Sequence, residues 1–199
     1  MMFPKKILTF LTFLIISLSS IVKVHSIEPD IFVQSTVNRA AKTLSGDFTK
    51  DERIEMLKEI AKDTVDINGI GLYTLGVYRK GLNEDQIENY KILFEQYFLK
   101  SFSSRLAEYS NPEIEVISKK EISKNYTMVY SKLVGTDLRP EVKIDWRIYT
   151  KNVNNPKIRD LIIEGLSLVR TQKEEFSSII QSNDEDINAL FTSLKEFIK

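Results

Sequence analysis

The spacing of apolar residues changes near Pro112, and this change limits which folds the chain can form. Between residues 28 and 109 apolar residues recur every three to four positions, as in amphipathic helices. After Pro112 they alternate with polar residues, as in half-buried strands. Two further helical segments cover about 171–181 and 186–198. The order of helices, strands and helices predicts an α+β domain, with helices packed on one face of a curved antiparallel sheet.

Four stretches have the character of strands, with turn signals between them: EIEVIS, YTMVYSKLVG, EVKIDWRIYT and KIRDLIIEG. In the third, Val142, Ile144, Trp146 and Ile148 alternate with charged or polar residues. This strand therefore has one dry face and one wet face. Between the dry face and the helices we expect either a filled core or a hydrophobic pocket.

The segment YKILFEQYFLKSF carries five aromatic residues on one side of a predicted helix that begins near Asn83. They are Tyr90, Phe94, Tyr97, Phe98 and Phe102. Such a stripe is either the core-facing side of the helix or one wall of a pocket. The spacing of the rings is the same in both cases, so this choice stays open.

The N-terminal residues have the pattern of a secretory signal peptide. Lys5 and Lys6 precede an apolar run, Ile7 to Val22, and Ser26 offers a small residue for cleavage. The alternative is an uncleaved anchor, but the run of 16 residues is shorter than the roughly 20 that a spanning helix needs. We therefore expect a signal peptide at residues 1–26 and a single secreted domain at residues 27–199.

Removal of residues 1–26 would take away the only histidine, His25, and the chain has no cysteine. This excludes triads built on histidine, disulfides, and zinc sites with histidine or cysteine ligands. Without Lys5, Lys6 and Lys23, 25 of the 28 basic residues remain against 28 acidic ones, so nucleic acid is not an expected partner. We predict no enzyme activity, no catalytic residues, no metal and no cofactor.

Two motifs follow each other at the spacing of a known family. The first matches Leu-Gly-x-Tyr, a turn, a Gln and a Phe-rich helix through Leu75, Gly76, Tyr78, Gln86, Phe94, Leu106 and Tyr109. The second matches Asp-x-x-x-Glu-Gly-x-Ser-Leu through Asp160, Glu164, Gly165, Ser167 and Leu168. In both, the chain resembles MlaC-type, toluene-tolerance proteins that bind phospholipid.

The resemblance implies a soluble periplasmic carrier. It would shuttle phospholipid between an outer-membrane lipoprotein complex and an inner-membrane ABC transporter complex with its lipid-binding ring subunit, in a system for outer-membrane lipid asymmetry. Exposing an acyl chain to water costs ~0.8 kcal/mol per CH₂, so two chains amount to something on the order of 20 kcal/mol. A dry slot in a carrier removes this cost.

If the resemblance holds, nine residues are expected to line the acyl slot: Tyr78, Phe94, Phe98, Val142, Ile144, Trp146, Ile148, Leu161 and Ile163. Core packing is the alternative for each of them. Gly71 and Gly76 are expected to let their segment approach the sheet, or else to break a helix. Arg79, Lys80 and Lys173 are candidates for contact with a phosphate, or lie on solvated helix faces.

Two other functions compete with lipid carriage. A protein-interaction module would dock a partner on exposed aromatic residues. An isomerase-like enzyme would use Asp145 or Asp160 as a base and Tyr126 or Tyr130 as a proton donor. The sequence leaves open the lipid class (phospholipid or a hopanoid-like lipid), the direction of transport and the oligomeric state.

Overall fold

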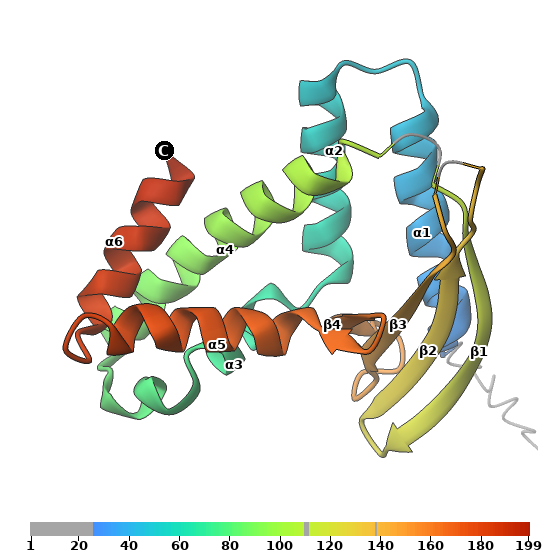
Figure 1. Cartoon of the computed structure of the whole chain (residues 1–199). Coiled ribbons are helices and arrows are strands. Elements are labelled where there is room, and N and C mark those ends of the chain that lie inside the picture. The colour runs from blue at the N-terminus through green and yellow to red at the C-terminus, as the bar shows by residue number, and fades with distance from the viewer. Residues whose placement is uncertain (1–25, 110–111, 138) are drawn as a thin grey trace, which may run out of the picture.

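A curled antiparallel sheet organises the fold (Figure 1). The computed structural model describes residues 26–109, 112–137 and 139–199, and in these residues the sheet has five strands in chain order. The strands are β1 (Ile114–Ser123), β2 (Tyr126–Leu133), β3 (Val142–Tyr149), β4 (Lys157–Ile163) and β5 (Leu166–Ser167). The predicted α+β class is confirmed, with a two-residue fifth strand in addition. The predicted signal peptide lies outside the described residues, apart from Ser26.

The two faces of the sheet differ in chemistry. Trp146 of β3 lies between Val129 of β2 and Leu161 of β4, and these apolar side chains share what we call the inner face. Along β2 the residues of this face are buried and the others are half-buried. The dry and wet sides predicted for β3 therefore correspond to the inner face and the opposite, outer face.

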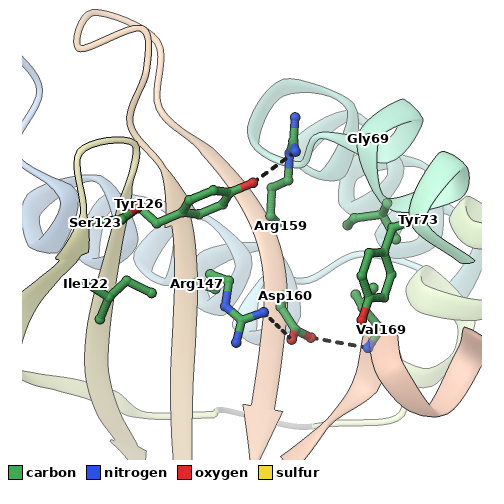
Figure 2. Close-up of a pocket in the computed structure, with 10 residues that line it drawn as sticks. Gly69, Tyr73, Ile122, Ser123, Tyr126, Arg147, Arg159, Asp160 and Val169 are labelled. Atoms are coloured by element: carbon green, nitrogen blue, oxygen red, sulfur yellow. Dashed lines mark hydrogen bonds and ion pairs between the residues drawn. The ribbon is translucent and has the colours of Figure 1, made fainter.

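A bulge interrupts the alternation in β4. Arg147 of β3 pairs with Asp160, whereas the next residue, Ile148, pairs with Ile158, so Arg159 is an extra residue in β4. A bulge of this kind bends its strand and re-aims side chains. Arg159 and Asp160 both extend over the outer face, as Figure 2 shows.

The helices fall into two groups by what they contact. α1 (Pro29–Ser45) packs on β1 and β2, while α3 (Ile67–Thr74) and α5 (Leu168–Gln181) pack on β4. The long helix α4 (Glu84–Leu106) packs against α2 (Lys50–Thr64), α3 and α6 (Ile187–Ile198). The 3₁₀ helix η1 (Gly76–Gly81) leads from α3 toward α4. The aromatic helix thus has other helices as its main neighbours.

Capping boxes fix where two of these helices begin. The Asn83 side chain accepts a hydrogen bond from the Gln86 backbone N–H at 2.9 Å, and the Gln86 side chain accepts one from the Asn83 N–H at 3.0 Å. Thr49 and Glu52 form the same arrangement at the start of α2. The start at Asn83 agrees with the sequence prediction. Loss of such a cap typically costs about 1 kcal/mol. The pair Asn83 and Gln86 therefore defines where the aromatic helix starts.

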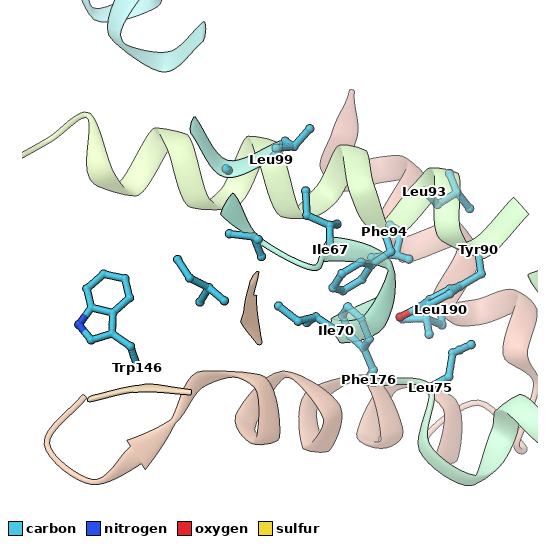
Figure 3. Packing of buried hydrophobic residues seen from close by; sticks show 14 of the residues in the cluster. Ile67, Ile70, Leu75, Tyr90, Leu93, Phe94, Leu99, Trp146, Phe176 and Leu190 are labelled. Carbon is cyan, nitrogen blue, oxygen red and sulfur yellow. The ribbon is translucent and has the colours of Figure 1, made fainter. Parts of the chain in front are cut away.

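The hydrophobic core runs from the helices to the inner face (Figure 3). Tyr90 and Leu190 lie at one end of it and Trp146 at the other. Its polar atoms are satisfied, because the Tyr90 hydroxyl is 2.8 Å from Thr74 Oγ1 and Trp146 Nε1 donates to Ser131 Oγ at 2.8 Å. An unpaired buried polar group would cost about 1–3 kcal/mol, so these partners keep the rings in place.

The prediction for Gly71 and Gly76 was wrong about the sheet. A Cβ atom on Gly71 would lie 2.7 Å from Cδ1 of Phe94, so this glycine lets α3 approach α4. Gly76 has φ +58°, a left-handed conformation that favours glycine, and it ends the α3 segment. The alternative interpretation, a broken helix, is therefore correct for Gly76.

The contact between α3 and α4 predicts that Gly71→Ala destabilises the protein. The added methyl group must displace the buried Phe94 ring, and overpacking of this kind costs about 1–3 kcal/mol. Gly81→Ala is the matched control, because a Cβ there meets nothing within 4 Å. Urea unfolding followed by circular dichroism measures both. Equal stabilities of the two variants would contradict the close approach.

Candidate functional site

The aromatic side of α4 forms a stack of rings. Ring centroids are 5.8 Å apart for Tyr90 and Phe94, 6.1 Å for Phe94 and Phe98, and 5.5 Å for Phe98 and Phe102. Tyr90 and Phe94 are 0% and 1% exposed, whereas Phe98 and Phe102 are only half-buried. The first half of the stripe is therefore core, and the second half leaves ring surface uncovered. None of these four rings is exposed enough to form the docking surface of the alternative hypothesis.

The nine residues predicted to line a slot divide into two groups by burial. Phe94, Trp146 and Ile148 are buried. The half-buried ones are Tyr78, Phe98, Val142, Ile144, Leu161 and Ile163. Strand register brings the six strand residues together on the inner face, and Phe94 and Phe98 belong to the ring stack of α4. Tyr78 lies on η1 and packs against the hydrophobic core. Their contact with a ligand stays a prediction.

Burial on the inner face decreases toward the start of β3. Ile148 is fully buried, whereas Ile144 and its partner Ile163 on β4 are half-buried. Leu166, which pairs with Ile163, is 56% exposed. The sheet therefore presents apolar surface that the helices leave uncovered. We use the term inner-face patch for Ile144, Leu161, Ile163 and Leu166.

Sequence reasoning missed Leu166 as part of this patch. It follows a tight turn at Glu164 and Gly165, which have φ +50° and +83°. Two consecutive positive φ values are typical of a type I′ hairpin turn, which places Leu166 opposite Ile163. The signal for this hairpin was the Glu-Gly pair after an apolar run. Phe102 was likewise counted in the stripe but not among the site residues.

A separate cavity of about 380 Å³ lies over the outer face, between the sheet, α3 and the start of α5 (Figure 2). It is lined by Gly69, Ile70, Tyr73, Ile122, Ser123, Tyr126, Arg147, Arg159, Asp160 and Val169. None of the nine predicted residues lines it. The cavity combines apolar side chains with two arginines and a carboxylate.

Arg159 connects the sheet to the start of α3. Its Nε donates to Asp66 Oδ2 at 2.6 Å, and one terminal nitrogen donates to the Tyr126 hydroxyl at 3.0 Å. Its guanidinium carbon also lies 4.1 Å from the centroid of the Tyr149 ring, a cation–π contact. Asp66 in turn accepts the Gly69 N–H at 2.9 Å as the N-cap of α3. Arg159 therefore fixes the direction in which α3 leaves the sheet.

Asp160 connects the sheet to the start of α5. This carboxylate is 3% exposed and accepts hydrogen bonds from the Ser167 hydroxyl at 2.7 Å and the Val169 N–H at 3.2 Å. A terminal nitrogen of Arg147, its partner in the β3–β4 ladder, lies 3.7 Å from one of these oxygens. Both oxygens accept protein hydrogen bonds, so Asp160 acts as a structural acceptor that joins β4 to the start of α5.

The other carboxylate of the isomerase hypothesis is Asp145. Burial raises its pKa above the ordinary value, and it pairs across the sheet with Tyr130. Neither residue lines the outer-face cavity.

In the part of the chain that the structure describes, no cluster of three acidic or histidine side chains is arranged to hold a metal. No helix among the described residues has the length and apolarity to cross a membrane.

The role of Asp160 predicts that Asp160→Ala is strongly destabilising. The change leaves the Ser167 hydroxyl and the Val169 N–H without their acceptor, at a cost of about 1–3 kcal/mol. Arg147→Gln should cost less than about 1 kcal/mol, because the Arg147 side chain is 43% exposed and its ion pair is long. Thermal unfolding of both variants tests this order. A reversed order would show that Arg147, not α5, stabilises the carboxylate.

Comparison with known proteins was made by sequence and by structure. A family model described as MlaC protein matches residues 33–196. A phospholipid-binding protein from Ralstonia solanacearum, solved in complex with a phospholipid, has a TM-score of 0.73 and 18% identity, covering 86% of this chain and 97% of that chain. No curated protein matches. The resemblance of the two sequence motifs is confirmed, and because the family match spans most of its length, this chain belongs to the MlaC family.

Proposed function

We propose that this protein binds a phospholipid and carries it across the periplasm between membrane complexes. The observation that carries the proposal is the MlaC family match over residues 33–196, together with a fold shared with a structure that contains a phospholipid. The proposed partners are an inner-membrane ABC transporter complex with its lipid-binding ring subunit and an outer-membrane lipoprotein complex. Carriage makes and breaks no covalent bond, so it needs no catalytic residue and no cofactor.

The geometry supports a place for the acyl chains. The ring stack of α4 and the inner face both change from buried to half-buried along their length, at Phe98 and at Ile144. α4 ends at Leu106 and β1 begins at Ile114, so a short connection joins the uncovered end of the stack to the sheet. We propose that acyl chains lie between these two uncovered surfaces, on a floor formed by Trp146 and its neighbours.

The driving force follows from the area that a lipid would cover. Half-buried Phe98, Phe102 and the inner-face patch lose contact with water when an acyl chain covers them. Burial of apolar surface contributes roughly 25 cal/mol per Å², and each CH₂ removed from water contributes ~0.8 kcal/mol. Protein and lipid therefore both gain from binding.

The compartment is part of the same proposal. Residues 1–26 are proposed to direct export and to be removed, which leaves residues 27–199 as the carrier domain. The family match begins at Val33, within α1, and ends before the last residues of α6. All of the matched sequence thus lies in the proposed mature domain.

Native mass spectrometry tests the proposal directly. The full-length sequence is expressed in a Gram-negative host, and the protein is purified from the periplasm without detergent. We expect an adduct of about one lipid per chain, which organic extraction identifies as phospholipid. A bare protein mass, with no uptake from vesicles containing labelled phospholipid, would refute lipid carriage.

Two variants of one helix locate the slot. Phe98→Asp places a charge on the uncovered part of the ring stack and should abolish most of the lipid adduct, because burying an unpaired carboxylate is costly. Ile92→Asp is the matched control, since Ile92 is 51% exposed on the same helix. It should keep the adduct. Equal lipid content in the two folded variants would remove α4 from the slot.

A further inference from the structure

The outer-face cavity is separate from the proposed acyl slot. Arg147 lines the cavity, and its neighbour Trp146 belongs to the core beneath the inner face. Successive side chains of a strand point to opposite faces of the sheet. One strand therefore presents an arginine to the cavity and a tryptophan to the slot, and a ligand in one site does not touch the other residue.

Most of the charge in the cavity is compensated within the protein. Arg159 is balanced by Asp66, whose Oδ2 lies 2.6 Å and 2.5 Å from two of its nitrogens. Asp160 accepts from Ser167 and Val169 at the start of α5, where the helix dipole also stabilises negative charge. Neither of these two charged groups requires a ligand.

Arg147 has the weakest contacts of these charged groups. Among the described residues, the interaction found for its guanidinium is the ion pair with Asp160 at 3.7 Å, which is longer than a hydrogen bond. Arginine carries five N–H donors in a planar fork that matches the oxygens of a phosphate group. Figure 2 shows this side chain next to Asp160 inside the cavity. Within the described residues, the cavity thus contains a guanidinium group with one long ion pair and no hydrogen bond.

The rest of the wall suits an apolar or aromatic group. Tyr73 and Ile122 are 49% and 46% exposed, and both line the cavity together with Val169. Lys173 Nζ lies 5.3 Å from the centroid of the Tyr73 ring, so a second cation is near this rim. A volume of about 380 Å³ lies at the small end of the range for ligand pockets, roughly 300–1,000 Å³.

We propose that the outer-face cavity is a second binding site, for a phosphate group carried on an apolar or aromatic body. The phosphate binds Arg147, and the body lies against Tyr73, Ile122 and Val169. This chemistry is shared by small organophosphates and by the head group of a lipid. The inference does not depend on the proposed function, because the two sites lie on opposite faces of the sheet.

A nuclear magnetic resonance titration tests the site with three probes: inorganic phosphate, phenyl phosphate and dihexanoyl phosphatidylglycerol. Phenyl phosphate is expected to shift the Arg147 Nε–H signal and the amide signals of Gly69 and Ser123, and to leave the Trp146 indole signal unchanged. Inorganic phosphate should bind several-fold more weakly, because it lacks the apolar body. If the short-chain lipid shifts the same signals, the site recognises a lipid head group. If only phenyl phosphate shifts them, the site recognises a small organophosphate.

Three variants make the test specific. Arg147→Gln should lower the affinity for phenyl phosphate about tenfold or more. Lys143→Gln, on the same strand and face but outside the cavity, should change the affinity by less than about twofold. Ile122→Glu keeps Arg147 but adds a negative charge at an exposed position of the rim, and should also weaken binding.

Three results would overturn the proposal. They are unchanged affinity in both Arg147→Gln and Ile122→Glu, equal affinity for inorganic and phenyl phosphate, or shifts around Trp146 with none around Arg147. The lipid adduct in native mass spectrometry is expected to be the same in Arg147→Gln and wild type. The second site and the lipid carrier can therefore fail independently of each other.

Discussion

The placement of the helices depends on two polar contacts at one bulge in β4. Arg159 bonds Asp66 at the start of α3, and the adjacent Asp160 bonds Ser167 and Val169 at the start of α5. Because strand β4 turns both side chains to the same face, it directs two helices away from one edge of the sheet. α3 then places Gly71 against α4, and this contact positions the aromatic stack. Hydrogen bonds at the bulge thus determine where the apolar surfaces lie.

The aromatic helix combines a buried half with a half-buried half. Its first rings are buried among α3 and α6, where burial contributes to folding in the usual way. Its last rings are only half-buried, although they belong to the same stack. A fully covered helix would make a more stable core but would leave no apolar surface for a ligand. The incomplete burial of Phe98 and Phe102 leaves the apolar surface on which the proposed lipid site depends.

Much of this fold was predictable because the responsible signals are local. The alternation along β3, the start of the aromatic helix at Asn83 and the second family motif, Asp160 to Leu168, each depend on a few consecutive residues. The close approach at Gly71 was assigned to the wrong neighbour, because a glycine shows that something is near without showing what. The fifth strand was missed, since two residues carry no periodicity.

The outer-face cavity shows why the remaining site could not be predicted. Its walls come from α3, α5 and four strands, and Arg159 joins them only because a bulge changes the direction of β4. The run KIRDLII gives no alternation from which that bulge could be inferred. The contact between Arg147 and Asp160 requires only that two consecutive strands pair. A cavity requires in addition the angle between helix and sheet, which no local pattern encodes.

The simple order of the strands has a consequence for how the chain folds. Each strand pairs with the strand that precedes or follows it, so every ladder can close through a hairpin as soon as its two strands are available. Contacts between neighbours in sequence lower the entropic cost of the search and favour fast folding. A chain without cysteine has no disulfide to hold a partly folded sheet. Fast formation of consecutive hairpins lets such a chain bury its apolar strands before they can associate with the strands of another molecule.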